Sequence, residues 1–148
     1  MKLISHRGNL DGPNPLEENK PEYIQNALDL GYDVEIDVWS IDNNLFLGHD
    51  NPQYPIDISF LKDSRLWSHA KNFEALIILY ENRDSIHFFV HDSDTHILTS
   101  KMFIWTYPNN KLSKYSVCVI PEICRDLSDL KICYGLCSDY VQRYKGMV

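Results

Sequence analysis

The sequence predicts one α/β domain spanning residues 1–148, built on a largely parallel sheet. Three observations support this prediction. Short apolar runs of strand length recur along the chain, connections of helix length separate several of them, and two of these connections carry a helical pattern of apolar residues. The 148 residues, of which 44% are hydrophobic and 24% are charged, are enough to form one buried core.

Eight runs are predicted to be strands, because each is short, apolar and bounded by turn-forming residues. They are residues 2–5, 33–41, 44–49, 65–70, 86–91, 101–107, 115–121 and 131–140. The pair Asn43-Asn44 predicts a tight turn between the second and third runs. Residues 44–48 are therefore expected to form a short excursion within a longer connection.

Two segments are predicted to be helices. Residues 21–31 begin with Pro21, carry apolar residues at helical spacing and end at Gly31. Residues 72–83 begin with Asn72, a residue type that commonly caps a helix. Weaker patterns predict single turns over residues 59–64 and 122–130.

The charge and the cysteines restrict the partners and the compartment. A net charge of −7 argues against a nucleic-acid partner, because binding many phosphates requires clustered Lys and Arg. The first residues contain no apolar stretch long enough for a signal peptide or a membrane span, so no stable membrane insertion is expected. The four cysteines include no C-x-x-C pair and are expected to be free thiols rather than zinc ligands, in a cytoplasmic protein.

Two carboxylates of the second predicted strand form a candidate metal site. Glu35 and Asp37 are two residues apart, so their side chains are expected to share one face of the sheet. Neighbouring carboxylates repel each other unless a cation lies between them, and oxygen ligands suit Mg²⁺ or Ca²⁺. The alternative is a solvent-facing pair of acids that binds nothing.

Two histidines end apolar runs and form a candidate acid–base pair. His6 and Arg7 follow the first predicted strand, at the end of a parallel sheet where ligands gather, and His49 follows the third run. An arginine can hold a phosphate through two hydrogen bonds. Two histidines, one accepting and one donating a proton, are what phosphodiester cleavage requires near neutral pH. The alternative for His6 is a purely structural role.

One further stretch rich in His and Asp, and the single residue Asp139, are expected to have supporting rather than catalytic roles. Residues 88–96 could form a second metal site, but His91 and Asp92 are better explained as strand-end residues beside the same site, with Asp94 capping the next turn. Asp139 is expected to tie the last strand to neighbouring loops.

Taken in order, these residues resemble the glycerophosphodiester phosphodiesterase family, whose members are (β/α)₈ barrels of the phosphatidylinositol-phospholipase-C-like kind. The resemblance rests on the motifs HRG (6–8), EN (18–19), a helix ending at Gly31, EIDV (35–38) and GHD (48–50), which cover the first third of the chain. The later matches HAKN (69–72), FIWTYP (103–108) and GLCSDYV (135–141) are weaker.

The resemblance implies a metal-dependent hydrolase of glycerophosphodiesters or related small phosphodiesters. His6 and His49 would be the general acid and base, Arg7 would bind the phosphate, and Lys71 would help to neutralise the phosphoryl oxygens. The substrate's own neighbouring hydroxyl would attack phosphorus, and water would then open a cyclic phosphate.

Three residues would have substrate-binding roles by the same resemblance. Glu18 and Asn19 would belong to the rim of the site, with Glu18 steadying Arg7 or the metal shell. Trp105 would line the path of the substrate.

The metal ligands implied by the resemblance are Glu35, Asp37 and, in place of the family's third acidic ligand, His69. Mg²⁺ is the expected ion, with Ca²⁺ and Mn²⁺ as alternatives, because an imidazole ligand disfavours Ca²⁺. His69 could instead be hydrogen-bonded without binding a metal.

The fold implied by the resemblance is a compact, reduced (β/α)₈ TIM-type barrel. Several outer helices are expected to be shortened or missing, because a complete barrel typically needs about 250 residues. A second copy could cover an open side, so a homodimer is possible.

Two alternative functions remain open. A phospholipase-D-like relative would act on lipid head groups, although such proteins are generally secreted and disulfide-bonded. A degenerate, non-catalytic barrel would bind a phosphorylated ligand without hydrolysing it, and the short chain and His69 favour this alternative.

Overall fold

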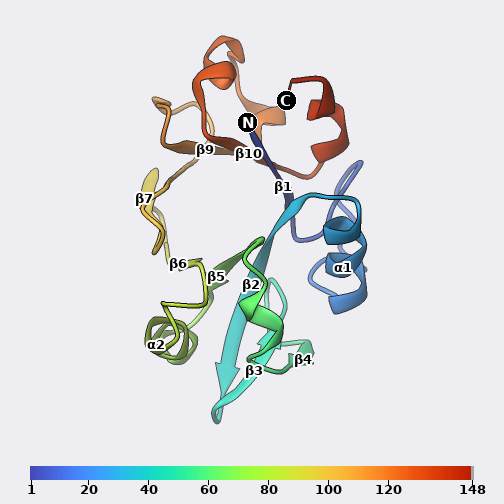
Figure 1. The fold of residues 1–148 in the computed structure, drawn as a ribbon, viewed down its shortest axis with the longest axis vertical. Coiled ribbons are helices and arrows are strands. Elements are labelled where there is room, and N and C mark those ends of the chain that lie inside the picture. The colour runs from blue at the N-terminus through green and yellow to red at the C-terminus, as the bar shows by residue number, and fades with distance from the viewer. Residues whose placement is uncertain (148) are drawn as a thin grey trace.

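The computed structural model describes residues 1–147, which form one curled sheet of ten strands with helices outside it (Figure 1). The strands are β1 (Lys2–His6), β2 (Asp33–Ile41), β3 (Asn44–Leu47), β4 (Tyr54–Ile56), β5 (Leu66–Ala70), β6 (Phe88–Phe89), β7 (His96–Leu98), β8 (Ile104–Thr106), β9 (Ser116–Val119) and β10 (Gly135–Ser138). The helices are α1 (Pro21–Asp29), α2 (Phe73–Glu81) and the 3₁₀ segments η1 (Phe60–Lys62), η2 (Pro121–Ile123), η3 (Ser128–Ile132) and η4 (Val141–Met147).

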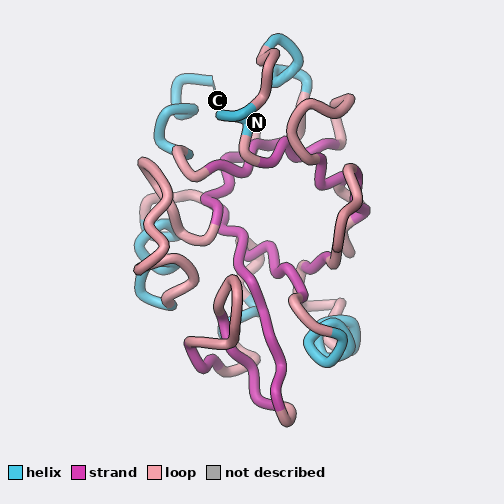
Figure 2. The backbone as a smooth tube through the Cα atoms, turned by 180° about the vertical axis from the view of Figure 1, so that it is seen from behind, coloured by secondary structure: helices cyan, strands magenta, loops and turns pink. Residues whose placement is uncertain are grey.

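The first strand, β1, lies in the middle of the sheet. Parallel ladders run from β1 through β2 and β5 to β6 on one side, and through β10 and β9 to β8 on the other. The strands β3, β4 and β7 are added in antiparallel orientation. The sheet is therefore mixed, and its parallel part curls around a common axis (Figure 2).

The expected reduced (β/α)₈ barrel is wrong, because the sheet forms a curled half-barrel. Among residues 1–147 no ladder joins β6 to β7, and only β1–α1–β2 and β5–α2–β6 place an α-helix between parallel strands. The lengths of the other connections explain this. Residues 107–115 between β8 and β9 are too few for a helical crossover, and β7 occupies the connection 90–103 between β6 and β8.

Two hydrogen bonds between Phe88 and Ser100 help to bridge the place where the sheet does not close. The Phe88 N–H donates to Ser100 Oγ at 2.9 Å, and the Ser100 N–H donates to the Phe88 carbonyl oxygen at 2.8 Å. Phe88 begins β6, and Ser100 lies between β7 and β8. We call this place, between β6 and the β7–β8 hairpin, the seam.

The hairpin of β2 and β3 projects from the curl, because β2 is longer than its parallel neighbours (Figure 2). Its turn residues Asp42 and Asn43 have φ angles of 49° and 62°, the left-handed conformations that a type I′ turn requires. The predicted tight turn and short excursion are confirmed, although the turn is centred one residue earlier than Asn43-Asn44.

Both predicted α-helices are confirmed, and each ends two residues earlier than predicted. In α1 the first residue is Pro21, whose missing N–H would have no helical partner at this position. At the start of α2 the Asn72 side chain accepts from the Ala75 N–H at 3.1 Å. The same side chain donates to the Ser40 carbonyl oxygen at 2.7 Å, which fastens α2 to the end of β2.

Alternation along β2 separates the two faces of the sheet. Val34, Ile36 and Val38 are fully buried in a core that also contains residues of α1 and α2. Glu35 and Asp37 point to the inside of the curl. The apolar side chains that fill the inside are Ile4, Trp67, Phe89, Ile97, Trp105, Val117, Val119 and Cys137.

Other sequence predictions have mixed outcomes. Each of the eight predicted runs contains a strand, but β4 and β7 were not predicted. The four cysteines are free thiols, as expected. No helix within residues 1–147 combines the length and the apolar character needed to cross a bilayer.

His87, just before β6, makes the stability of the fold sensitive to acid. It is 8% exposed, its ring centroid lies 4.1 Å from that of Trp67, and Nε2 lies 2.9 Å from Thr99 Oγ1. Burial lowers the pKa of His87 to about 4, and the charge of Lys101 acts in the same direction. The unfolded chain takes up this proton near pH 6.5, so the folded state loses stability as the pH falls from about 6.5 to about 4.

We expect His87→Gln to weaken this acid dependence. The free energy of unfolding of the natural protein should fall by roughly 3 kcal/mol more than that of the variant between pH 7 and pH 4. Urea titrations across this range measure the difference. His96→Gln, at an exposed position, is the control and should follow the natural protein. Equal acid dependence of all three proteins would contradict the assignment.

Candidate active site

The register of the parallel strands brings four predicted site residues together, at the carboxyl ends of β1 and β5 and on the adjoining part of β2. His6 of β1 is paired with Glu35 of β2, and Asp37 of β2 is paired with His69 of β5. Residues in register on neighbouring strands carry their side chains on the same face. All four side chains therefore converge inside the curl.

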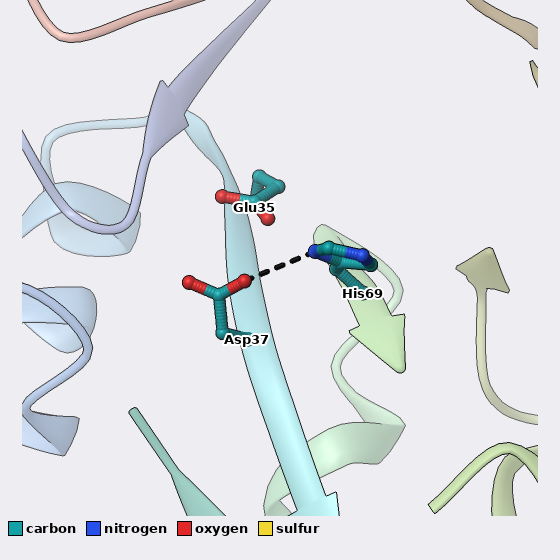
Figure 3. Close-up of side chains that lie close together, drawn as sticks. All are labelled: Glu35, Asp37 and His69. Carbon is teal, nitrogen blue, oxygen red and sulfur yellow. Dashed lines mark hydrogen bonds and ion pairs between the residues drawn. The ribbon is translucent and has the colours of Figure 1, made fainter. Parts of the chain in front are cut away.

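Glu35, Asp37 and His69 form a group that can hold a divalent metal (Figure 3). The three side chains are buried, and one ligand atom from each lies within 4.8 Å of the others. Within residues 1–147, Glu35 Oε2 is buried without a hydrogen-bond partner. A second carboxylate beside this unpaired oxygen makes the arrangement unfavourable unless a cation compensates both charges. The donor set therefore fits a divalent cation.

The two carboxylates differ in their pKa values. Burial, followed by the charge of Asp37, raises the pKa of Glu35. Burial would also raise the pKa of Asp37, but the hydrogen bonds with His49 and His69 and the charge of Arg7 hold it well below its usual value. Asp37 is therefore the fixed negative charge of the site.

Polar and cationic groups surround the Asp37 carboxylate. Asn19 Nδ2 donates to Oδ2 at 2.9 Å, and Asn19 Oδ1 accepts from the Asp37 N–H at 2.9 Å. His49 Nδ1 lies 3.2 Å from Oδ2, and His69 Nδ1 lies 3.0 Å from Oδ1. Lys71 Nζ lies 3.6 Å from Oδ1. These contacts come from three separate segments and orient both oxygens of Asp37.

His49 comes from the loop after β3, and Gly48 sets its position. Gly48 has a φ of 152°, and a Cβ there would lie 2.1 Å from the Asn51 carbonyl oxygen, so only glycine fits. The Gly48 N–H donates to the Asp37 carbonyl oxygen at 3.2 Å, and Trp39 Nε1 donates to the Gly48 carbonyl oxygen at 2.7 Å. The loop is thereby fastened to β2, and His49 faces Asp37.

Arg7 leaves β1 through a left-handed backbone conformation, with a φ of 55° that is uncommon outside glycine and concentrates at functional sites. Nη1 lies 3.1 Å from Glu18 Oε2, Nη2 lies 3.3 Å from His49 Nε2, and Nε lies 3.2 Å from Asp37 Oδ2. Nε lacks a well-directed hydrogen bond, so Asp37 acts on Arg7 as an ion pair. This fixed guanidinium can bind a phosphate.

His6 is held by a carboxylate on the other side of the site. Its Nδ1 lies 2.7 Å from Asp139 Oδ1, and its Nε2 lies 3.8 Å from Glu35 Oε2. Burial would lower the pKa of His6, but the hydrogen bond with Asp139 and the charge of Glu35 outweigh burial and raise it. Asn9 Nδ2 donates to Asp139 Oδ1 at 2.8 Å, and Glu122 Oε1 accepts from the Asp139 N–H at 3.1 Å. Asp139 thus leaves Nε2 as the His6 nitrogen that faces the site.

The role of Asp139 was missed by the sequence analysis, which expected it only to tie the last strand to loops. Ser138 of β10 is in register with Ser5 of β1, so the residues that follow them, Asp139 and His6, lie side by side. An acidic residue directly after the strand that pairs with β1 is therefore the signal that could have identified the partner of His6.

Two hollows meet at this group and share His6, Arg7, His49 and Ile120 as lining residues. The outer chamber has a volume of about 450 Å³ and is also lined by Pro13, Pro15, Glu18, Asp50, Asn51, Gln53 and Asp139. The inner chamber has a volume of about 130 Å³ and is also lined by Glu35, His69, Lys71, Phe89, His91, Trp105, Tyr107 and Val119. A larger hollow near Lys2 and Tyr32 has no histidine or carboxylate among its described lining residues.

The predicted substrate-binding residues have different positions. Glu18 contacts Arg7, and both Lys71 and Trp105 line the inner chamber. Asn19 was expected on the rim of the site, and this prediction is wrong. It is fully buried, because its amide pairs with both the carboxylate and the N–H of Asp37.

A pair of residues on the wall of the inner chamber adds to the predicted set. His91 lies beside the site, as expected, and its ring stacks on that of His69 with centroids 4.4 Å apart. The Tyr107 hydroxyl, which sequence reasoning missed, is hydrogen-bonded to His91 Nε2. Burial, with the charge of His69, lowers the pKa of His91, and burial raises the pKa of Tyr107.

Comparison with known proteins found no relative: no family model, no curated protein and no solved structure matches the chain. A function for the site therefore has to be inferred from its geometry.

Proposed function

We propose that this protein is a metal-dependent phosphodiester hydrolase that acts on glycerophosphodiesters or related small phosphodiesters, as the glycerophosphodiester phosphodiesterase family does. One observation carries the proposal. Three stretches that are far apart in the sequence contribute side chains that surround one site: His6 and Arg7, Glu35 and Asp37, and His49.

The residues divide the work of binding and charge compensation. Arg7 would bind the phosphate, and Lys71, which lines the inner chamber, would neutralise a phosphoryl oxygen. Glu35, Asp37 and His69 would hold the divalent metal, with Mg²⁺ as the expected ion. When bound, such a metal supplies Lewis-acid stabilisation of the charge that develops on phosphorus-bound oxygens.

His6 and His49 would carry the protons. Asp139 engages Nδ1 of His6 and leaves Nε2 towards the site. Asp37 engages Nδ1 of His49, whose Nε2 faces Arg7 Nη2, the proposed phosphate-binding group. A carboxylate on one imidazole nitrogen orients the ring and supports proton transfer at the other. One histidine would take the proton of the attacking hydroxyl, and the other would protonate the leaving alcohol.

A non-catalytic phosphate-binding protein is the second candidate, and His69 favours it. His69 occupies the position where the resemblance expects an acidic ligand, and its Nδ1 already contacts Asp37 at 3.0 Å. A weaker metal site would leave Arg7 and Lys71 able to bind a phosphate without hydrolysis. The experiments below separate the two candidates.

Removal of either histidine is expected to abolish turnover. With sn-glycero-3-phosphocholine as the substrate and Mg²⁺ present, kcat should fall by about 10²- to 10⁴-fold in His6→Ala and in His49→Ala, because this substrate has a neighbouring hydroxyl to deprotonate and an alcohol leaving group to protonate. Release of choline measures the rate. His96→Ala is the control, since His96 is exposed on β7 and lines neither chamber.

Two results would overturn this assignment. Turnover that persists in both active-site variants would show that the histidines do not transfer protons. A natural protein that binds phosphate but gives no chelator-sensitive turnover with Mg²⁺ or Mn²⁺ would favour the non-catalytic candidate.

Replacement of Glu35 is expected to remove the metal site without unfolding the protein. Calorimetric titration of Glu35→Gln with Mg²⁺ or Mn²⁺ should show an affinity more than about tenfold lower than that of the natural protein. Without metal the variant should be at least as stable, because a buried charge beside Asp37 has been removed. Glu81→Gln, at an exposed position on α2, should leave both properties unchanged. Unaltered metal affinity in Glu35→Gln would place the metal elsewhere.

A further inference from the structure

We propose that His91 and Tyr107 form a hydrogen-bonded pair that binds a hydroxyl group on the substrate arm that enters the inner chamber. The inference rests on the proposed phosphodiesterase function, and it assigns a specificity-determining role to two residues that the preceding sections leave without one. It also divides the substrate: a short hydroxylated arm occupies the inner chamber, and the other alcohol group occupies the outer chamber.

The first step is the geometry of the pair. The His91 ring stacks on His69 at an interplanar angle of 10°, and the Tyr107 ring meets the His91 ring at 61° with centroids 4.9 Å apart. The Tyr107 hydroxyl is hydrogen-bonded to His91 Nε2. Each residue is thus oriented by the other, and His91 is also oriented by a side chain of the metal-binding group.

The second step is the hydrogen-bonding capacity that the Tyr107 hydroxyl keeps beside its bond to His91. The Tyr107 hydroxyl is hydrogen-bonded to the imidazole of His91, and this bond uses only part of its capacity. If Nε2 accepts from the phenol, the phenol oxygen can still accept from a ligand. If Nε2 donates, the phenol hydrogen is free to be donated. In both tautomers Tyr107 can bind one hydroxyl group that reaches the inner chamber.

The third step is the size of the inner chamber. Its volume of about 130 Å³ corresponds to about four water molecules in the liquid, so only a small fragment can enter. The outer chamber, of about 450 Å³, can take a larger group. Arg7, His6 and His49 line both chambers, which places a bound phosphate between the two arms.

The fourth step is the polarity of the inner wall. Glu35, Lys71, His91 and Tyr107 present polar groups to this small volume. A purely apolar arm would displace water from the Tyr107 hydroxyl without replacing its hydrogen bond, which is unfavourable. An arm with a hydroxyl group replaces that bond.

The test compares two ligands of equal carbon-chain length, sn-glycerol 3-phosphate and propyl phosphate, which differ in their hydroxyl groups. Calorimetric titration of the full chain with Mg²⁺ should show about tenfold tighter binding of the hydroxylated ligand, the contribution of about one hydrogen bond. Tyr107→Phe keeps the ring and should lose this preference. Tyr115→Phe removes the hydroxyl of an exposed tyrosine and should keep it.

A double-mutant cycle separates a binding pair from independent packing. His91→Phe keeps an aromatic ring next to His69 but removes both nitrogens, so Tyr107 loses its orienting partner. Because the two residues act as one unit, the double variant should lose no more of the preference than either single variant. Additive losses, or equal loss of affinity for both ligands, would overturn the proposal.

Hydrolysis of sn-glycero-3-phosphocholine by the natural protein, measured by release of choline, tests the proposed function separately. Turnover without a preference for the hydroxylated ligand overturns the role of His91 and Tyr107 and leaves the hydrolase standing. A preference that disappears in Tyr107→Phe, without turnover, supports the pair and overturns the hydrolase. Absence of both overturns both.

Discussion

The buried carboxylate of Asp37 is the contact on which the rest of the site depends. It sits in the middle of the sheet, on the strand paired with both β1 and β5, and it is 1% exposed. Asn19 and His49 contact one of its oxygens, and His69 and Lys71 contact the other. A charge buried this deeply is stable only with such compensation, so the position of each partner is coupled to the others.

This dependence explains how a short chain can assemble a polar site. The α-helices that would complete a barrel are absent from most connections within residues 1–147, so their packing does not position the loops. Hydrogen bonds take over this role. The loop of His49 is fastened through Gly48 to the backbone of β2, and α2 is fastened through Asn72 to Ser40. Polar contacts to one central strand replace part of an outer helical layer.

Local sequence patterns predicted most of the elements but not how the sheet closes. Pro21, Gly31 and Asn72 marked the two α-helices, because helix ends depend on a few residues with specific backbone preferences. The strand β7 was missed because a three-residue antiparallel strand has almost no periodicity to detect. The (β/α)₈ barrel was wrong because it was inferred from motifs in the first third of the chain, whereas closure depends on connection lengths in the last two thirds.

The candidate site was predictable where side chains lie on strands, and less so where they come from loops or from distant partners. Period-two alternation was enough to place Glu35 and Asp37 on one face. Asp139 and Tyr107 could not be assigned in this way, because their contacts with His6 and His91 depend on which strands are neighbours. The burial of Asn19 depends likewise on a long-range pairing, since its amide reaches the backbone and the side chain of β2.

The seam is the one place where the curled sheet described for residues 1–147 can open without breaking a ladder between strands. Elsewhere around the curl each strand is joined to its neighbour by a ladder, but at the seam the two hydrogen bonds of Ser100 take its place. His91 follows β6 and Tyr107 follows β8, so their hydrogen bond also crosses the seam, at the ends of these strands. Opening of the sheet at the seam would break this hydrogen bond and widen the inner chamber beside His91 and Tyr107. Glu35 and Asp37 lie on β2, which is paired on both sides, and would keep their positions when the seam opens.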